Sequence, residues 1–538
     1  MAAAEFPVSQ GDPEVRTAAG WVRGRWGEAD GTAGVAVFRG IPYARPPVGE
    51  LRFLAPRRPA RWDGVLEAAT FGPVAPQAVP ISASAIGAAQ RDRRPPADDG
   101  NWLTLNIWAP DPSAAAAAGG AEGGLPVLVW VHGGRYMFGS ASEPVYDGAT
   151  LARLGAVVVT CNYRLGVEGF SQIAGAPANR GLLDVVAALG WVAENIAGFG
   201  GDPAAVTVFG ESAGAGIIAA LLAMPVAKGL FRRAIAQSVP GTFFAPDLAS
   251  DITKAIAIQA GIVAAGSLPI GRPPTREALA TAAPYRLVAA QTAVTAALHE
   301  YRQWGLVALT VTPFSPVVDG EVLPRAPWRA LLSGAARDID LLVGHNKDEY
   351  RVFIEAGGKA GQITDAETAE VLRAFAPAPS GADAYRKAYP GIDPERLYEV
   401  VYSDWLFRMP SLHLAQAHAA SGGRTFLYEL TYPAPAAPEA LGACHGLDVP
   451  LVWGGKPGGI GLVMTGPEPP QEFTALGGLM RAEWLTFASQ GEPGWPVYGT
   501  ERRLARIYSY PPAVDPYPEE ASMHVWERHQ FDAIGLAG

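Results

Sequence analysis

Short runs of apolar, β-branched residues alternate with helical stretches through the central part of the chain. The runs at 103–110, 125–134, 156–166 and 204–210 have the length and composition of buried strands. Residues 180–200 carry apolar side chains at helical spacing and end on glycines, as a helix does. Strands that are apolar throughout are buried on both faces. The sequence therefore predicts an α/β fold, with a large, mostly parallel central sheet flanked by helices.

Further strand-like runs extend the expected sheet toward the C-terminus. They are 232–238, 339–349 and 424–430. Two Ala-rich stretches, around 245–310 and 355–420, have the composition of helices. We expect these to be helical insertions that form a lid region, with residues 1–538 making one domain.

The composition excludes several classes of protein. With 49% hydrophobic and 17% charged residues among 538, the chain has enough apolar material for a large core and is not disordered as a whole. Its net charge of −10 argues against a nucleic-acid partner, because binding to phosphates needs a basic surface.

Cysteine content and apolar run length bear on the compartment. Cys161 and Cys444 are the two cysteines, with no zinc-ligand spacing and no disulfide framework. Residues 1–15 have neither a basic start nor an apolar core, so we expect no signal peptide. The longest apolar runs are shorter than the roughly 20 residues of a membrane span. We therefore expect a cytoplasmic protein, and the heavy use of Ala, Gly, Pro and Arg suggests a bacterial one. The stretch 111–124 is typical of a flexible surface loop.

The segment TVFGESAGAGIIAA (207–220) places Ser212 between Gly210 and Gly214, after a strand-like run and before an Ala-rich helix that Pro225 ends. A serine hydroxyl is a weak nucleophile at neutral pH and needs a base, an orienting group and an oxyanion site. In a G-x-S-x-G turn the glycines avoid steric clashes, and the following helix directs its N-terminal amides at the developing charge. We interpret Ser212 as a nucleophile.

The stretch VLVWVHGGRYMFGS (127–140) places glycines at the end of a strand-like run. Exposed amides there suit an oxyanion hole completed by the amide of Ala213. The alternative is an ordinary glycine turn. His132 is equally well explained as a core histidine bonded to the backbone, and we assign it no catalytic role.

Ordered blocks along nearly the whole chain match a known family. They are FRGIPYARPPVGELRF (38–53), WDGV (62–65), FGPVAPQ (71–77), LTLNIWAP (103–110), CNYRLGVEGF (161–170), the segment 181–214, GLFRRAIAQS (229–238), FSPVVDGEVLP (314–324), LLVGHNKDE (341–349), ACHGLDVPLVWG (443–454) and WLTFASQGEPGWP (484–496). In these blocks the chain resembles the type-B carboxylesterases, the cholinesterase-like branch of the α/β-hydrolases.

The resemblance implies a catalytic triad of Ser212, Glu349 and His445, in the chain order of the α/β-hydrolases. Reasoning from the residues alone leaves the acid open, because Asp348 is adjacent to Glu349. It also leaves the histidine open. The alternatives are His345, His413 and His418, for which a core or surface position is the competing explanation.

The resemblance also implies an oxyanion hole formed by Gly133, Gly134, Arg135 and Ala213, with the amides at 134 and 135 as donors. Arg135 departs from the family pattern, which has Gly or Ala there. Its backbone can still donate. Its side chain either pairs with a local acid, the expectation we favour, or binds a substrate carboxylate.

Two further departures concern the substrate and the compartment. The family's first disulfide would need cysteines near Ala75 and Trp102, and their absence fits a reducing compartment. The segment 76–101 contains no aromatic residue to hold a quaternary ammonium, which disfavours choline esters. The residues that the resemblance would place in a substrate pocket, or equally in the core, are Tyr136, Met137, Phe138, Phe243 and Phe244.

Together these features predict a serine carboxylesterase that hydrolyses small to medium, uncharged or aryl esters through an acyl-enzyme. No metal or organic cofactor is implied, and we expect a monomer or homodimer whose partner is a small-molecule ester. One alternative is the same mechanism on amide, carbamate, thioester or lactone bonds. Another is a non-catalytic binding protein on the same scaffold, against which the triad residues weigh.

Overall fold

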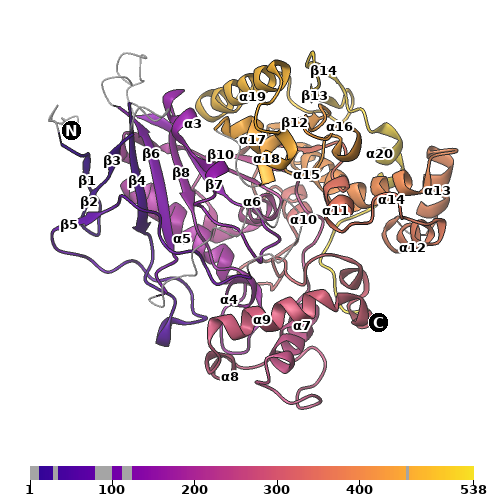
Figure 1. Cartoon of the computed structure of the whole chain (residues 1–538), viewed down its shortest axis with the longest axis horizontal. Helices are drawn as coiled ribbons and strands as arrows, with labels where there is room; N and C mark the ends of the chain where they lie inside the picture. Colours follow the sequence, from indigo (N-terminus) through magenta and orange to yellow (C-terminus); the bar gives the residue numbers. More distant parts are fainter. Residues whose placement is uncertain are drawn as a thin grey trace.

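A mixed sheet forms the centre of the computed structural model, which describes residues 11–27, 34–78, 100–111, 124–377, 379–455 and 460–537. Within these ranges the sheet has 11 strands in the order β14-β13-β12-β11-β10-β9-β7-β8-β6-β4-β3 (Figure 1). The strands are β3 (Arg25–Trp26), β4 (Val35–Pro42), β6 (Thr104–Pro110), β7 (Leu125–Val131), β8 (Val157–Cys161), β9 (Gly201–Glu211), β10 (Arg233–Gln237), β11 (Asp340–Asn346), β12 (Thr425–Leu430), β13 (Leu504–Tyr508) and β14 (Ala513–Pro516).

The inner strands of the sheet are parallel, as the sequence predicts. The run β8-β7-β9-β10-β11-β12-β13 is parallel throughout, whereas β6, β4, β3 and β14 pair antiparallel at the two edges. Val131 pairs with Gly210, and Gln237 pairs with both Glu211 and Gly344. The carboxyl ends of β7, β9, β10 and β11 therefore meet at one edge of the sheet, where ligands bind in open α/β sheets.

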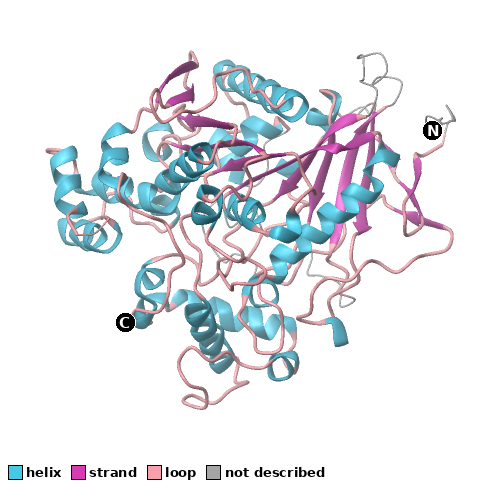
Figure 2. Cartoon of the chain, turned by 180° about the vertical axis from the view of Figure 1, so that it is seen from behind, coloured by secondary structure: helices cyan, strands magenta, loops and turns pink. Residues whose placement is uncertain are grey.

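Helices cover both faces of the sheet, as both views of the molecule show (Figures 1 and 2). Strand β7 divides its side chains between the two sides. Val127, Val129 and Val131 join one hydrophobic cluster, together with the helices α5 (Arg180–Asn195), α6 (Ala213–Ala223), α10 (Pro327–Leu332) and α15 (Met409–Ala420). Leu128 and Trp130 join the other, together with α3 (Ala149–Arg153), α17 (Asp448–Trp453) and α19 (Gln471–Gln490). Burial on both sides explains why these strands are apolar throughout.

The helices between and after the strands are short to medium in length. They are η1 (Gly49–Leu51), η2 (Pro144–Tyr146), α3 (Ala149–Arg153), α4 (Gly166–Phe170), α5 (Arg180–Asn195), η3 (Ile196–Phe199), α6 (Ala213–Ala223), η4 (Pro225–Ala227), α10 (Pro327–Leu332), α16 (Pro438–Leu441), α17 (Asp448–Trp453), α18 (Ile460–Thr465), α19 (Gln471–Gln490) and α20 (Glu520–Trp526). By length and composition, one helical stretch of the described ranges, 180–199, could cross a membrane, and the larger part of it is buried in the fold.

The two Ala-rich stretches are helical, and α15, at the end of the second, packs on the sheet. The first holds α7 (Pro246–Gln259), α8 (Arg276–Ala280), α9 (Pro284–Ala296), η5 (Leu298–Glu300) and η6 (Arg302–Leu309). The second holds α11 (Arg351–Ala356), α12 (Asp365–Phe375), α13 (Gly381–Ala388), α14 (Pro394–Ser403), the π-helical turn η7 (Asp404–Arg408) and α15 (Met409–Ala420). Figure 1 shows the first group below the sheet and α12–α14 to its right.

A second, small sheet lies at the N-terminal side of the molecule, in the order β1 (Glu14–Arg16), β2 (Trp21–Arg23) and β5 (Val65–Glu67). No pattern in the sequence predicted this sheet. The loop expected at 111–124 lies, apart from its two ends, outside the described residues, as do the first ten residues and most of the aromatic-free segment 76–101.

A buried ion pair joins the loop after β8 to α5. Arg164 and Asp184 are fully buried, with two contacts of 2.8 Å between guanidinium and carboxylate. Removing one partner leaves a buried charge unpaired, so we expect Asp184→Asn to lower the free energy of unfolding by about 3–5 kcal/mol. The control, Glu194→Gln, breaks an exposed pair with Arg58 and should cost at most about 1 kcal/mol. Equal urea midpoints for the two variants would contradict this.

Candidate active site

Ser212 lies at the turn between β9 and α6, at the carboxyl edge of the sheet. Its backbone has φ 57° and ψ −124°, in the region that favours glycine, and its N–H donates to the Gln237 carbonyl oxygen at 2.9 Å. The carbonyl of Ser212 accepts from Gly216 N–H in the first turn of α6, also at 2.9 Å. The structure thus holds this serine in a strained conformation between a strand and a helix, as a nucleophile turn requires.

The glycines that flank Ser212 are sterically required. A Cβ at Gly210 would lie 2.6 Å from the Val131 carbonyl oxygen, and one at Gly214 would collide with the same oxygen. Strand β7 therefore passes so close to the turn that only glycine fits on either side. This confirms the explanation of the two glycines given from the sequence.

His445 and Glu349 lie together at the same edge of the sheet. Glu349 follows β11, and its Oε2 is 2.5 Å from His445 Nδ1. The other oxygen, Oε1, accepts from the Ser238 hydroxyl at 2.5 Å and from Asn346 N–H at 2.8 Å. Because Glu349 is fully buried and both its oxygens are occupied, its orientation toward the imidazole is fixed.

The second imidazole nitrogen contacts a residue that the sequence analysis did not consider. His445 Nε2 is 3.0 Å from Glu211 Oε1, and Glu211 immediately precedes Ser212. The hydroxyl of Ser212 itself forms no hydrogen bond with any residue that the structure describes. The expected bond between this hydroxyl and the imidazole is thus not formed, and Glu211 Oε1 lies at ion-pair distance from the nitrogen without making a hydrogen bond to it. Such bonds are often long in the absence of substrate.

Burial and charge shift the pKa values of this pair. Burial raises the pKa of Glu211 to about 8, although His445 acts in the opposite direction. Burial alone would lower the pKa of His445, but the carboxylates of Glu211 and Glu349 outweigh it and raise the pKa to about 9. The two groups titrate as one coupled pair. Phe407 stacks on the imidazole, with ring centroids 4.1 Å apart, and shields it from water.

Asp348, the alternative acid, is engaged elsewhere. Its Oδ1 is 2.7 Å from Arg396 and 3.3 Å from Arg351, and its Oδ2 accepts from Ala443 N–H at 2.9 Å. Burial raises the pKa of this carboxyl, but the two arginines outweigh that and hold it below its ordinary value. Asp348 therefore connects neighbouring segments, and the structure does not bring it to an imidazole.

The other histidines considered from the sequence have structural contacts. His132 Nδ1 lies 2.8 Å from the Gly133 carbonyl oxygen, and its ring stacks on Tyr163. His345 contacts Tyr517, and burial lowers its pKa to about 4. His413 is half-buried beside Phe531, with its pKa also lowered to about 4 by burial. His418 contacts Thr425 and the Ala336 carbonyl. None of the four lies against Ser212 or Glu211 in the described contacts.

The loop after β7 approaches Ser212 closely. A Cβ at Gly133 would lie 3.2 Å from Ser212 Cβ, so this loop and the serine are in direct contact. The next three residues, Gly134, Arg135 and Tyr136, all have positive φ, at 115°, 54° and 59°. Three successive left-handed residues turn the chain sharply beside the start of α6, where Ala213 lies. Such a turn presents backbone amides in one direction.

The aromatic residues expected near the substrate differ in accessibility. Tyr136, Phe243 and Phe244 are at most 2% exposed and belong to the main hydrophobic cluster. A substrate could reach them only if neighbouring side chains moved, so the core explanation holds for these three. Met137 is also buried. Phe138 is half-buried, and Arg135 covers its ring with the guanidinium 4.9 Å from the centroid.

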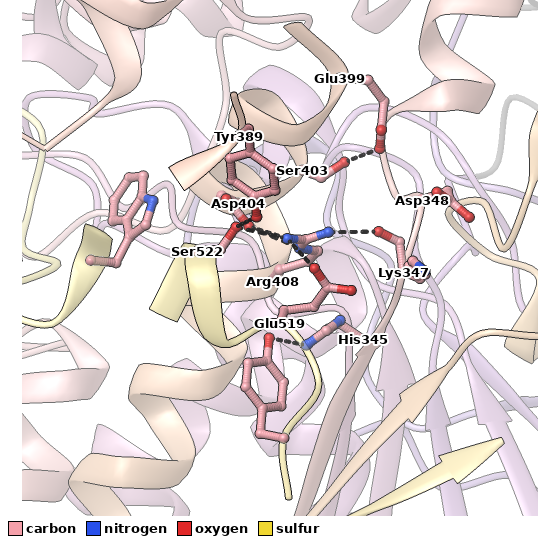
Figure 3. A network of polar contacts seen from close by, with 12 residues as sticks. His345, Lys347, Asp348, Tyr389, Glu399, Ser403, Asp404, Arg408, Glu519 and Ser522 are labelled. Carbon is pink, nitrogen blue, oxygen red and sulfur yellow. Dashed lines mark hydrogen bonds and ion pairs between the residues drawn. The ribbon is translucent and has the colours of Figure 1, made fainter. Parts of the chain in front are cut away.

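A buried polar network lies behind the segment that carries Glu349 (Figure 3). Arg408 of η7 donates to the Lys347 carbonyl at 3.0 Å and to Asp404 at 2.8 Å. It also lies 3.1 Å from Glu519, just before α20. His345 Nε2 forms a hydrogen bond with the Tyr517 hydroxyl at 2.8 Å. These contacts hold the end of β11 and the first residue after it, from which the chain leads to Glu349.

Several supporting residues were missed in the sequence. Ser238, with φ 60°, follows β10 and reaches Glu349. Asp448 accepts from Gln237 and Tyr428, each at 2.8 Å. Glu211 stands inside the G-x-S-x-G motif. Their positions in the sequence could have indicated them, because Glu211, Gln237 and Ser238 all lie at the ends of predicted strands.

The strand order, the serine turn and the helices on both faces together define an α/β-hydrolase fold.

Comparison with known proteins agrees with this fold. A profile of the carboxylesterase family matches residues 11–507. The chain is 35% identical to the para-nitrobenzyl esterase of Bacillus subtilis over 512 residues, covering 92% of this chain and 96% of that one. A solved structure titled PNB esterase superposes with a TM-score of 0.79 at 33% identity, covering 96% and 99% of the two chains. A carboxylesterase of Geobacillus stearothermophilus superposes with a TM-score of 0.76 at 35% identity, covering 95% and 99%. The chain belongs to the carboxylesterase family, and it is a carboxylic ester hydrolase.

Proposed function

We propose that the protein hydrolyses small-molecule carboxylic esters through an acyl-enzyme on Ser212, with His445 as general base and Glu349 as the acid that orients it. The observation that carries the proposal is the joint position of these groups. Ser212 lies on a strained turn at the end of β9, and the Glu349–His445 pair faces the preceding residue, Glu211.

In the first half of the reaction, Ser212 Oγ attacks the ester carbonyl carbon. His445 Nε2 takes the hydroxyl proton, for which it must leave Glu211 and turn to the serine. Glu349 holds Nδ1–H and stabilises the imidazolium that forms. The amides of Gly134, Arg135 and Ala213 are proposed to receive the negative oxygen. When the intermediate collapses, the C–O bond to the alcohol breaks, and Nε2–H protonates the leaving alcohol.

In the second half, a water molecule attacks the acyl-enzyme. His445 removes its proton and then returns the proton to Ser212 Oγ as the ester bond to the serine breaks, releasing the carboxylic acid. A fluorophosphonate probe tests the proposal, because it reacts only with an activated serine. We expect one equivalent of label on Ser212, together with loss of p-nitrophenyl butyrate hydrolysis. Label on another residue, or hydrolysis that survives full labelling, would overturn the proposal.

The contact between Glu211 and His445 leads to a pH prediction. Two carboxylates hold the proton on His445, so kcat/KM for p-nitrophenyl butyrate should rise with pH, with the midpoint of the rise near pH 9. Glu211→Gln removes one of the two negative charges. The neutral imidazole then exists at lower pH, and we expect the midpoint of the rise to fall by about 1–3 pH units.

The control for this experiment is Glu194→Gln, which changes the net charge equally on the exposed surface of α5. Its pH profile should match that of the unmodified protein. An unchanged midpoint in Glu211→Gln would show that Glu211 does not act on the general base.

A further inference from the structure

Arg135 is a half-buried cation without a carboxylate partner among the residues that the structure describes. Its Nη1 donates to the Val311 carbonyl at 3.0 Å, and its guanidinium lies over Phe138, 4.9 Å from the ring centroid. The remaining nitrogens, Nε and Nη2, contact no acceptor in these described ranges and are not sealed from solvent. The expectation that Arg135 pairs with a local acid is therefore wrong for the described part of the chain.

Two aromatic side chains link the surroundings of the guanidinium to the proposed base. Tyr350, which follows Glu349 directly, is close enough to Arg135 to affect its pKa. The Tyr350 ring is 5.2 Å from Phe353, and Phe353 is 5.4 Å from the His445 imidazole. The backbone amide of Arg135 belongs to the loop that contacts Ser212.

This position is held firmly. Thr312 Oγ1 donates to the Arg135 carbonyl oxygen at 3.0 Å, so the same loop that binds the side chain also binds the backbone. Burial lowers the pKa of Arg135 below its ordinary value, and the smaller effect of Tyr350 does not offset this. Tyr350 is not an anion at neutral pH, because burial raises the pKa of its phenol. The half-buried cation thus has no opposing charge among the described residues, which is unfavourable unless a ligand supplies one.

We propose that Arg135 binds a carboxylate of the substrate, and that the preferred substrates are half-esters of short dicarboxylic acids. This inference rests on the proposed esterase function and specifies its substrate class. It replaces the expectation of uncharged or aryl esters. The free nitrogens form a planar edge that pairs with two carboxylate oxygens at once. A substrate with a single carboxylate suits the site, because Arg135 supplies only one positive charge. A second negative charge on the substrate would be repelled by the buried acids Glu211 and Glu349.

A purely structural role for Arg135 is the competing explanation. In that case the guanidinium only supports Phe138 and the loop at Val311, and its loss would weaken the hydrolysis of all esters by the same factor. The ratio of kcat/KM for a charged and a neutral ester separates the two explanations, because damage to the loop cancels in the ratio.

The experiment compares mono-p-nitrophenyl glutarate with p-nitrophenyl pentanoate, which has the same acyl length and no charge. In Arg135→Met we expect the ratio of kcat/KM for glutarate over pentanoate to fall about tenfold, as for the loss of a charge-assisted hydrogen-bonded pair. Arg135→Lys keeps the charge without the planar edge and should retain part of the preference. A ratio in Arg135→Met within threefold of the original overturns the proposal.

The matched control is Lys228→Met, which removes one exposed positive charge before β10, at the opposite end of the parallel strands. We expect both kcat/KM values to be unchanged in this variant. As a second measurement, free glutarate should inhibit pentanoate hydrolysis competitively, and the inhibition should weaken in Arg135→Met. Equal inhibition in the two proteins would overturn the proposal. Loss of pentanoate hydrolysis in Ser212→Ala concerns the esterase function separately, so the two failures are distinguishable.

Discussion

Replacing Ser212 by alanine is expected to lower kcat for p-nitrophenyl butyrate by about 10⁴-fold or more, because the acyl-enzyme can no longer form. The free energy of unfolding should change little or rise, since the variant removes a hydroxyl with no hydrogen bond to the described residues. Alanine also tolerates the φ of 57° no worse than serine does. The measurement is steady-state hydrolysis with spontaneous hydrolysis subtracted, together with urea unfolding.

The control for this variant is Ser489→Ala on the exposed side of α19, whose hydroxyl bonds to its own helix. It should keep the original kcat. Residual activity above about one part in a thousand in Ser212→Ala, carried by a folded protein free of contaminating esterase, would exclude an acyl-enzyme on this serine.

The second large effect concerns the two adjacent acids. Glu349→Gln should lower kcat about 10⁴-fold, because an amide facing Nδ1 favours the wrong imidazole tautomer and cannot stabilise the imidazolium. Asp348→Asn breaks contacts with Arg396 and Arg351 instead. We expect it to lower the urea midpoint and to change kcat less than tenfold at a temperature where the variant is folded.

The pair of variants decides between the acids that the sequence left open. The measurement is kcat of both variants with the same ester, after circular dichroism has shown that each variant is folded. If Asp348→Asn lost activity as strongly as Glu349→Gln while remaining folded, the role given to Glu349 would not be specific. A fully active Glu349→Gln would exclude it from catalysis.

The buried strands were predictable, and the edges of the sheet were not. Strands β8 and β11 are buried at every residue, and each contains a run of three consecutive apolar residues, 157–159 and 341–343. At the edges, β13 has half-buried positions and β14 is largely exposed, so neither leaves a continuous apolar run. Strand β4 is buried over four residues but then bulges between Phe38 and Ile41, which interrupts its pattern.

The proposed active site also has a part that was predictable from the sequence and a part that was not. Ser212 and its glycines are visible in the sequence, because a local turn imposes a local pattern. The pairing of Glu349 with His445 joins residues 96 positions apart, and only the resemblance to a family selected it over Asp348. The contact of Glu211 with His445, and the lack of a carboxylate partner for Arg135 among the described residues, depend on distances between loops. No spacing along the chain encodes them.

The polar network around Arg408 has a consequence for shortened forms of the chain. Arg408 binds the segment that carries Glu349 on one side and Glu519 on the other, while Tyr517 binds His345. In the chain, these supporting residues come after all three proposed reacting residues, Ser212, Glu349 and His445. A polypeptide that stops shortly before residue 517 should therefore be inactive, even though it contains every side chain proposed to react.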